Sequence, residues 1–252
     1  MIAWPGRFAA AFRFLTIIPL PGNLGTAEDE LAGATPFFPL VGLLLGGIAV
    51  PVVWLLQLLV PPLVTAVLAT LVLFAFSGGL HLDGLADTAD GFFSSRPREK
   101  ILEIMRDSAT GAMGVIALVV LLLLKVACLS SLSSSLLPVV FLMPLAGRTA
   151  ILLMMGLLPY ARPQGGLATL FYSRRSRMVG LGSLVLFTGV AWLVAGVQGI
   201  MAVLAVILVV VLFGWFCRLK IGGATGDTLG AACELAETVV ALVSVAALGG
   251  HA

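Results

Sequence analysis

Residues 113–137 read MGVIALVVLLLLKVACLSSLSSSLL, and Lys125 is their only charged residue. A helix needs about 20 mostly apolar residues to cross the hydrocarbon core of a bilayer, so this stretch is long enough to span a membrane. The whole chain has the same character, because 60% of its 252 residues are hydrophobic, 10% are charged and the mean hydropathy is +1.16. Such a composition excludes a soluble globular protein and a disordered chain. It predicts a polytopic membrane protein.

Apolar stretches of similar length recur along the chain, at residues 39–60, 63–80, 139–158, 179–198, 199–217 and 231–248. With residues 113–137 they predict about seven transmembrane helices. The joints at Pro61-Pro62 and Gln198-Gly199 leave room only for tight turns, so each is expected to connect a helical hairpin. We therefore expect an all-α fold, a single transmembrane helical bundle in which residues 1–252 form one integral-membrane domain.

The N-terminal segment is apolar but shorter than a span. Phe8–Ile18 contains Arg13, Arg7 precedes it, and Pro19 and Pro21 follow it. We expect an amphipathic helix that lies in the membrane interface. A cleaved signal sequence and a short or re-entrant span are the alternatives, although no small-residue cleavage pattern stands out.

Positive charges occur in alternate connections between the predicted spans. Twelve of the fourteen Lys and Arg residues lie before the first span or in the connections at residues 81–112, 159–178 and 218–230. The intervening connections and the C-terminus carry none. By the positive-inside rule, the N-terminus and these three connections lie in the cytoplasm and His251-Ala252 lies outside. The same alternation supports an odd number of spans.

The other two cations, Lys125 and Arg148, fall inside predicted spans. A charge in hydrocarbon is unfavourable, so each is expected to face the bundle interior, where a phosphate or carboxylate neutralises it. Snorkelling of the side chain towards the membrane surface is the alternative. Cys128, Cys217 and Cys233 form no CxxC pattern, so neither a zinc site nor a disulfide is indicated.

The main acidic motif follows the second span. Residues 81–92 read HLDGLADTADGF, and in a helix Asp83, Asp87 and Asp90 share one face because they lie at i, i+4 and i+7. Like charges crowded at a membrane edge repel one another unless a cation lies between them. Hard carboxylate oxygens suit Mg²⁺ or Mn²⁺ shared with a substrate phosphate, so the motif predicts a metal-dependent phosphoryl-transfer site. A structural cap or turn is the alternative.

A short polar segment follows this motif on the same membrane face. Residues 96–107, RPREKILEIMRD, predict an amphipathic helix with Glu103 and Asp107 at i and i+4. On the opposite face, the serines of residues 130–135 predict the polar tip of a hairpin.

The last cytoplasmic connection is rich in glycine. Residues 222–230 read GGATGDTLG, which lets the backbone approach a ligand, and the helix start that follows favours an anion. Asp227 either caps this helix or supplies a metal ligand. Glu234 lies on the same helix face and is expected to be functional, whereas Glu237 lies off that face.

Four segments in order carry a resemblance to a known family. They are HLDGLADTADG at residues 81–91, EIMRDS at 103–108, GAMG at 111–114 and TGDTLGA at 225–231. Together they closely resemble the cobalamin synthase family of adenosylcobinamide-GDP ribazoletransferases. Further matches are Phe38-Pro39-Leu40-Val41-Gly42, Arg148 and Pro159-Tyr160-Ala161-Arg162, so the resemblance covers nearly the whole chain. Ala109-Thr110 and Cys233 differ from the residues usual in that family.

The resemblance implies the last assembly step of the corrinoid pathway. In that family, α-ribazole or its 5′-phosphate attacks adenosylcobinamide-GDP, which gives adenosylcobalamin or its phosphate and releases GMP, with Mg²⁺ as the metal. It implies a multi-pass enzyme of the bacterial cytoplasmic (inner) membrane whose active site faces the cytoplasm. The implied partners are these substrates and the lipid bilayer, without nucleic acid. A homo-oligomer or a complex with other corrinoid-pathway enzymes is compatible with it.

The resemblance and the charge pattern together select the candidate residues of one catalytic domain. Asp83, Asp87 and Asp90 are expected to hold the metal, and His81 and Asp227 to complete the catalytic group. Either a carboxylate or His81 is expected to take the proton from the ribose hydroxyl. The residues expected to bind substrate are Arg96, Arg98, Arg106, Asp107, Lys125, Arg148, Arg162 and Glu234.

Two other classes remain as alternatives. Residues 87–91, DTADG, match the start of the CDP-alcohol phosphotransferase signature, but Ser94-Ser95 occupies its Ala-Arg position and Glu103 replaces one of its downstream aspartates. A secondary transporter or ion channel would also explain Lys125 and Arg148. Its carboxylates would lie near the bilayer midplane, however, whereas those of this chain collect on one face.

Overall fold

The computed structural model describes residues 4–132, 135–162, 167–172 and 175–249. These residues are largely helical and contain no strand, and one isolated β-bridge joins Tyr160 to Ala224. The all-α fold expected from the sequence is confirmed. In chain order the elements are α1 (Trp4–Leu15), α2 (Glu28–Ala32), η1 (Thr35–Phe37), α3 (Phe38–Leu59), α4 (Pro62–Ser77), α5 (Leu80–Phe92), α6 (Arg98–Ile104), α7 (Ala112–Ser131), α8 (Leu136–Leu157), η2 (Leu167–Phe171), α9 (Ser176–Ile221) and α10 (Gly226–Gly249).

Five of the described helices are long and apolar enough to cross a membrane, namely α3 extended by η1, α7, α8, α9 and α10. The bent pair α4–α5 meets the same test as a sixth span. At about 1.5 Å per residue, the 46 residues of α9 would be more than twice as long as the roughly 30 Å hydrocarbon core. A straight α9 would therefore not fit within one crossing.

Helix α9 is broken at Gly196, whose φ of 55° and ψ of −130° are not helical. A Cβ atom at Gly199 would lie 2.0 Å from the carbonyl oxygen of Ala191. In a continuous helix these two residues would be about 12 Å apart along the axis, so the chain folds back here. Residues 176–195 and 197–221 are the arms of a helical hairpin, which brings the bundle to about seven spans. The hairpin predicted at Gln198-Gly199 is confirmed, with its break at Gly196.

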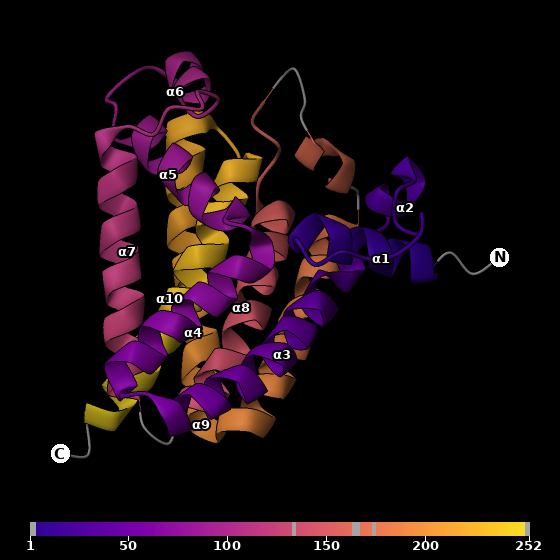
Figure 1. Ribbon diagram of the computed structural model, residues 1–252. Helices are drawn as coiled ribbons and strands as arrows, with labels where there is room; N and C mark the ends of the chain where they lie inside the picture. The colour runs from indigo at the N-terminus through magenta and orange to yellow at the C-terminus, as the bar shows by residue number, and fades with distance from the viewer. Residues whose placement is uncertain (1–3, 133–134, 163–166, 173–174, 250–252) are drawn as a thin grey trace.

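Helix α8 occupies the centre of the bundle, where it packs against α3, α9 and α10 (Figure 1). Glycines allow α3 to approach it closely. A Cβ atom at Gly46 would lie 2.3 Å from the Phe141 carbonyl oxygen, and one at Gly42 would lie 2.7 Å from that of Pro144. Close backbone approach strengthens the van der Waals contacts that hold helices together in lipid.

Helix α5, which carries the acidic motif, turns away from α4 instead of continuing it. Gly78 (φ 60°) and Gly79 (φ 86°) separate the two helices, and the axis bends by 91°. Glycine adopts two such left-handed conformations in succession without steric strain. After the bend, α5 packs against α7 and α10 (Figure 1). The break therefore brings the aspartates to the start of α10.

The predicted N-terminal helix is present as α1, but it spans Trp4–Leu15 rather than Phe8–Ile18. Phe12 and Leu15 are buried, whereas Trp4 is exposed, and the helix packs against η1 and α3. Figure 1 shows it beside the start of α3, across the direction of the bundle. The apolar face that the sequence places in the membrane interface thus packs largely against α3 and η1.

The structure describes the remaining predicted segments to different extents. The helix expected at residues 96–107 is α6, which spans Arg98–Ile104. The serine-rich hairpin tip lies only partly within the described residues, because residues 133–134 are not described. His251-Ala252 lies outside the described residues.

Candidate active site

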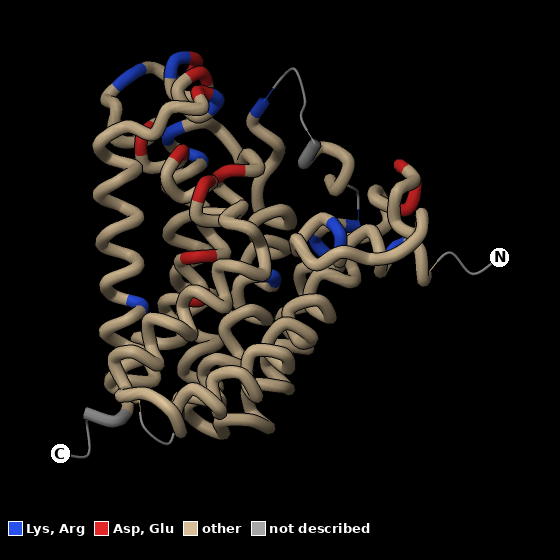
Figure 2. The backbone as a smooth tube through the Cα atoms, in the orientation of Figure 1, with Lys and Arg blue, Asp and Glu red and all other residues tan. Residues whose placement is uncertain are grey.

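Three segments far apart in the sequence meet at one end of the bundle. The Arg98 Nε atom donates to the carbonyl oxygen of Ile221 (2.7 Å), and its Nη2 atom donates to that of Ala161 (2.8 Å). Backbone hydrogen bonds run from Ala161 N–H to Ala224 (2.8 Å) and from Ala224 N–H to Pro159 (2.9 Å). In Figure 2, Lys and Arg residues gather at this end around α6, and others lie on α1 beside the start of α3. The connections predicted to share one face do so where the structure describes them.

Arg98 connects all three segments through these contacts. Its guanidinium spans α6, the residues after α8 and the end of α9, and both acceptors are backbone carbonyls. A planar fork of donors is suited to such a bridge. The geometry indicates a tie between connections. Arg98 does not line the pocket described below, and its contact with substrate stays a prediction.

The three aspartates of the acidic motif lie on α5, as their spacing predicts. Asp83 is exposed, whereas Asp87 and Asp90 are partly buried. One carboxylate oxygen of Asp90 accepts the N–H of Gly111 (2.6 Å) and the other accepts that of Gly114 (2.8 Å). These groups belong to the start of α7, so Asp90 caps that helix from a neighbouring one.

Asp227 lies in the first turn of α10. That helix is capped by Thr225 and Thr228, since Thr228 N–H donates to Thr225 Oγ1 (3.3 Å) and Thr225 N–H donates to Thr228 Oγ1 (2.8 Å). The carboxylate of Asp227 instead accepts a hydrogen bond from Arg162 Nη2 (2.5 Å). Its backbone packs against α5, where a Cβ atom at Gly84 would lie 2.7 Å from the Asp227 carbonyl oxygen. Asp227 therefore faces the site and is not the cap considered from the sequence.

Carboxylates outnumber cations where α5 meets α10. Asp83, Asp90 and Asp227 all lie close enough to Asp87 to repel its charge, and Arg162 is the cation that attracts it. Among the described residues, no three His, Cys, Asp or Glu side chains are already gathered around one point as metal ligands. The excess of hard carboxylate oxygens is nevertheless an environment that a divalent cation neutralises. Because both oxygens of Asp90 accept backbone N–H groups, Asp83, Asp87 and Asp227 are the donors that fit such an ion best.

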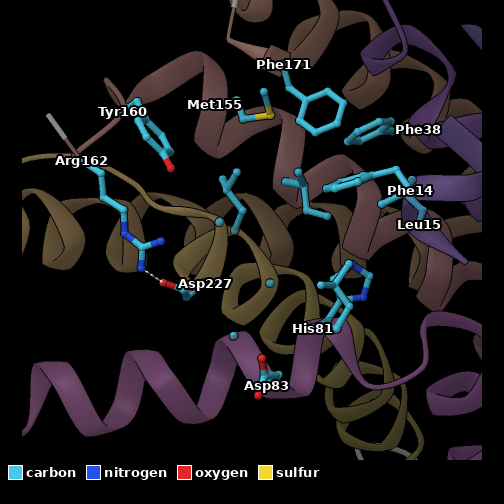
Figure 3. Close-up of a pocket in the computed structure, with 16 residues that line it drawn as sticks. Phe14, Leu15, Phe38, His81, Asp83, Met155, Tyr160, Arg162, Phe171 and Asp227 are labelled. Carbon is cyan, nitrogen blue, oxygen red and sulfur yellow. Dashed lines mark hydrogen bonds and ion pairs between the residues drawn. The ribbon is translucent and has the colours of Figure 1, made fainter. Parts of the chain in front are cut away.

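A pocket of about 220 Å³ lies at this junction. Figure 3 shows Asp83, Asp227 and Arg162 on its polar side, with the Asp227–Arg162 ion pair drawn. The remaining lining residues are Phe14, Leu15, Phe38, Leu80, His81, Gly84, Ile151, Met155, Tyr160, Phe171, Gly226, Leu229 and Gly230. The phenylalanines lie across the pocket from the ion pair (Figure 3). A cavity with a charged side and an apolar side suits a ligand that has both characters.

His81 lies in the first turn of α5 and lines the same pocket. Its side chain is buried, and no hydrogen bond joins its ring to another described residue. A neutral imidazole has one ring nitrogen that can accept a hydrogen bond from a ligand. The predicted grouping of His81 with Asp83 and Asp227 is therefore present in the structure.

A separate network of buried ion pairs lies within the bundle. Lys125 Nζ is 2.7 Å from Glu234 Oε2 and 3.2 Å from Glu237 Oε2, and Arg148 Nη1 is 2.8 Å from Glu237 Oε1. The prediction that both cations face the interior and meet an anion is confirmed. Glu237, which the helix spacing placed off the functional face, takes part in two of these contacts. None of the four residues lines the pocket, so substrate contact by Lys125, Arg148 and Glu234 has no support in this geometry.

The other candidates for substrate binding lie at the same end of the bundle. Arg96, Arg106 and Asp107 are exposed and do not line the pocket. The carboxylate of Asp107 accepts the N–H of Ala109 (3.1 Å) in a local turn. Their contacts with substrate stay predictions. Arg162 does line the pocket and is placed as a phosphate clamp would be.

The apolar side of the pocket was not predicted from the sequence. Phe14, Phe38 and Phe171 come from three separate segments, and an aromatic residue in an apolar chain is ordinarily part of the core. Phe38 does lie in a segment that carries the family resemblance. Phe171 has no comparable signal.

Comparisons with known proteins agree with the resemblance. The family model described as cobalamin-5-phosphate synthase matches residues 7–245. A protein from Roseiflexus sp. (strain RS-1) named adenosylcobinamide-GDP ribazoletransferase is 41% identical over 245 residues, which cover 96% of this chain and 91% of that protein. A protein of the same name from Desulforamulus reducens is 42% identical over 231 residues, which cover 91% of this chain and 92% of that protein. Another from Klebsiella pneumoniae (strain 342) is 39% identical over 240 residues, which cover 93% of this chain and 97% of that protein. No solved structure matches.

These matches extend over nearly the whole chain and include both segments that build the pocket, the acidic helix α5 and the start of α10. They assign the chain to this family rather than to either of the two alternative classes considered from the sequence. With its long apolar helices, the protein is a multi-pass membrane enzyme. The chain belongs to the cobalamin-5-phosphate synthase family.

Proposed function

We propose that the protein is a Mg²⁺-dependent transferase that joins adenosylcobinamide-GDP to α-ribazole or its 5′-phosphate and releases GMP. The product is adenosylcobalamin or its 5′-phosphate, in the last assembly step of cobalamin biosynthesis. The observation that carries this proposal is the convergence of Asp83, Asp227 and Arg162 on one pocket. Relatives matched over at least 91% of their length bear the name of this activity.

The reaction replaces a phosphoanhydride bond with a phosphate ester bond. The ribose hydroxyl oxygen forms a bond to the phosphorus that carries the cobinamide, and the bond from that phosphorus to the GMP oxygen breaks. GMP leaves with the electron pair of the broken bond, and the hydroxyl proton passes to a base. Asp83 and His81 both line the pocket and are the candidates for that base.

The charges around the pocket suit a diphosphate. Arg162 presents a guanidinium whose remaining donors can bind phosphate oxygens. The start of α10, with Gly226 and Gly230 in the lining, adds the positive end of a helix dipole. When bound by Asp83, Asp87 and Asp227, a divalent cation would neutralise the charge that develops on the departing GMP.

The site is further proposed to face the cytoplasm, in the inner membrane of a bacterium. The pocket lies at the end of the bundle where α6 and the residues after α8 and α9 meet, and Lys and Arg residues gather at that end (Figure 2). The positive-inside rule assigns such an end to the cytoplasm. Nucleotide substrates would reach the pocket from that compartment.

The test is turnover by the purified protein in lipid. Adenosylcobinamide-GDP, α-ribazole and Mg²⁺ are supplied together, and GMP and the cobalamin product are followed by chromatography. We expect the two products in equal amounts, no product after chelation of the metal, and strong loss of activity in Asp83→Asn. Asp29→Asn is the matched control, since Asp29 is exposed and outside the pocket. GMP release without cobalamin, or full activity in chelator, would contradict the proposal.

A further inference from the structure

The pocket has an aromatic wall that the reaction chemistry does not use. We define this aromatic wall as Phe14 from α1, Phe38 from α3 and Phe171 from η2. Ring centroids are 4.5 Å apart for Phe14 and Phe171, 5.5 Å for Phe38 and Phe171, and 6.0 Å for Phe14 and Phe38. Each ring contacts the other two, so the wall is held in place before any ligand arrives.

Core packing alone does not account for this arrangement. Phe38 and Phe171 are only 1% and 2% exposed, as in a core, but both border the 220 Å³ pocket. Protein interiors rarely contain voids much larger than a water molecule, because an empty space forfeits the contacts of the atoms around it. A preformed aromatic surface beside an open space indicates a planar apolar occupant.

Size and polarity decide which part of the two substrates the aromatic wall can bind. A cavity of 220 Å³ is smaller than the roughly 300–1,000 Å³ of drug-sized ligand sites, so a corrin ring does not fit. A guanine base carries an amino group, a carbonyl and a ring N–H, and Phe14, Phe38 and Phe171 offer none of the partners these groups need. The dimethylbenzimidazole of α-ribazole is a flat bicyclic ring with two methyl groups and a single free ring nitrogen. Its small size suits the pocket, and its low polarity suits the aromatic wall.

The geometry also orients such an occupant. Figure 3 places the phenylalanines at one end of the pocket and Asp227, Arg162 and the Tyr160 hydroxyl at the other, with Asp83 and His81 along the α5 side. A base seated on the wall would direct its sugar towards the charged end. The ribose hydroxyl would then lie on the side where Asp83 and His81 are placed to accept its proton.

We propose that the aromatic wall seats the dimethylbenzimidazole base of the ribazole substrate, while the ribose points towards Asp83 and Asp227. This inference rests on the proposed function for the identity of the substrates. It adds the subsite for the acceptor and assigns Phe14, Phe38 and Phe171 to its recognition. The nucleotide of the other substrate then lies on the charged side.

The first test uses the unmodified protein in lipid nanodiscs without adenosylcobinamide-GDP. Binding of α-ribazole is followed through the fluorescence of its benzimidazole ring. We expect free dimethylbenzimidazole to displace α-ribazole, because the wall binds the base without its sugar, and GMP to leave it bound. Displacement by GMP together with no displacement by dimethylbenzimidazole would overturn the assignment.

The second test uses conservative variants of the wall. Phe14→Leu and Phe171→Leu remove the aromatic face but retain an apolar side chain, and we expect each to raise the Kd for α-ribazole roughly tenfold. The KM for adenosylcobinamide-GDP should not change. Phe187→Leu is the matched control, because Phe187 is fully buried and lies outside the pocket.

The two tests separate this inference from the proposed function. If the wall variants weaken α-ribazole binding but the wild-type protein forms no cobalamin, the reaction is wrong and the subsite stands. If the protein forms cobalamin but Phe14→Leu and Phe171→Leu bind α-ribazole as the wild type does, the subsite is wrong and the reaction stands. A variant that does not fold leaves the competition experiment on the wild-type protein to decide.

Discussion

Asp227 lies in the first turn of α10 and also faces the proposed metal site, and mutation can separate its effect on the helix from its effect on the metal. Thr225 and Thr228 cap α10, so Asp227→Asn should keep the helix while removing one negative charge beside the proposed metal. We expect the Mg²⁺ concentration for half-maximal GMP release to rise roughly 10- to 100-fold. Thr228→Ala is the control: it should lower stability by about 0.5–2 kcal/mol through loss of the capping hydrogen bonds with Thr225 and leave the Mg²⁺ requirement unchanged. An unchanged requirement in Asp227→Asn would remove it from the metal site.

Asp87 and Asp90 lie on the same helix but should respond differently to the same substitution. Asp87→Asn should lower turnover by at least about 10²-fold with the fold intact, because it removes charge that preorganises the metal. Asp90→Asn should destabilise the protein, since one amide oxygen replaces two acceptors for Gly111 and Gly114. The free energy of unfolding should fall by about 1–3 kcal/mol, the cost of leaving a buried N–H group without an acceptor. Turnover at limiting Mg²⁺ and thermal unfolding in detergent measure both effects. Equal thermal stability of the two variants would refute the capping role of Asp90.

Arg98 acts at the scale of elements, because it ties α6 to the residues that follow α8 and α9. Lysine retains the charge but cannot present two donors in a planar fork. We expect Arg98→Lys to lower kcat by up to about 10²-fold, since small displacements of reacting groups are that costly. The KM values should change little. Arg177→Lys is the matched control, as Arg177 is exposed and outside the pocket.

A second measurement identifies a positioning role for Arg98. Amide hydrogen exchange at Gly222 and Ala224, whose N–H groups donate to Arg218 and Pro159, should be faster in Arg98→Lys and unchanged in Arg177→Lys. Loss of activity with unchanged exchange would indicate direct contact with substrate instead.

Local signals in the sequence predicted the elements well. Apolar length predicts the spans, and the spacing of the aspartates predicts one helical face on α5. The bend between α4 and α5 depends on Gly78 and Gly79, and glycine occurs so often in this chain that these two do not stand out. The role of Asp90 was not predictable either, because its partners Gly111 and Gly114 are backbone donors brought close by tertiary packing.

The site shows the same division between local pattern and tertiary arrangement. Charged residues are rare here, so Asp83, Asp227 and Arg162 could be selected from the sequence and do meet in the pocket. The same rarity drew attention to Lys125 and Arg148, whose partners are other protein side chains. Phe171 escaped notice because only its contact with Phe14 and Phe38 distinguishes it from any other apolar residue.

At the scale of the whole molecule, the buried ion network links three helices of the bundle. Lys125→Met leaves Glu234 without a cation and should lower stability by about 3–5 kcal/mol. Combining it with Glu234→Gln restores charge balance while Arg148 and Glu237 stay paired, so the double variant should recover part of the loss. Lys100→Met, which breaks an exposed pair with Glu103, should change stability by at most about 1 kcal/mol. Thermal unfolding in detergent ranks the three, and a single variant as stable as Lys100→Met would exclude a structural network.

The orientation of the bundle is the last property that the charge pattern predicts. Lys and Arg cluster at the end that holds α6 and the pocket, whereas Ser131 at the end of α7 lies at the other end of that helix, away from the acidic site. The positive-inside rule therefore places Arg96 in the cytoplasm and Ser131 outside. Arg96→Cys and Ser131→Cys are compared by labelling intact cells with a membrane-impermeant thiol reagent. Both positions are exposed, and the native Cys128, Cys217 and Cys233 are buried, so they add little background. We expect Ser131→Cys to react in intact cells and Arg96→Cys to react only after the membrane is opened. The reverse result would place the pocket outside the cytoplasm, where the supply of a guanosine nucleotide would have no ready explanation.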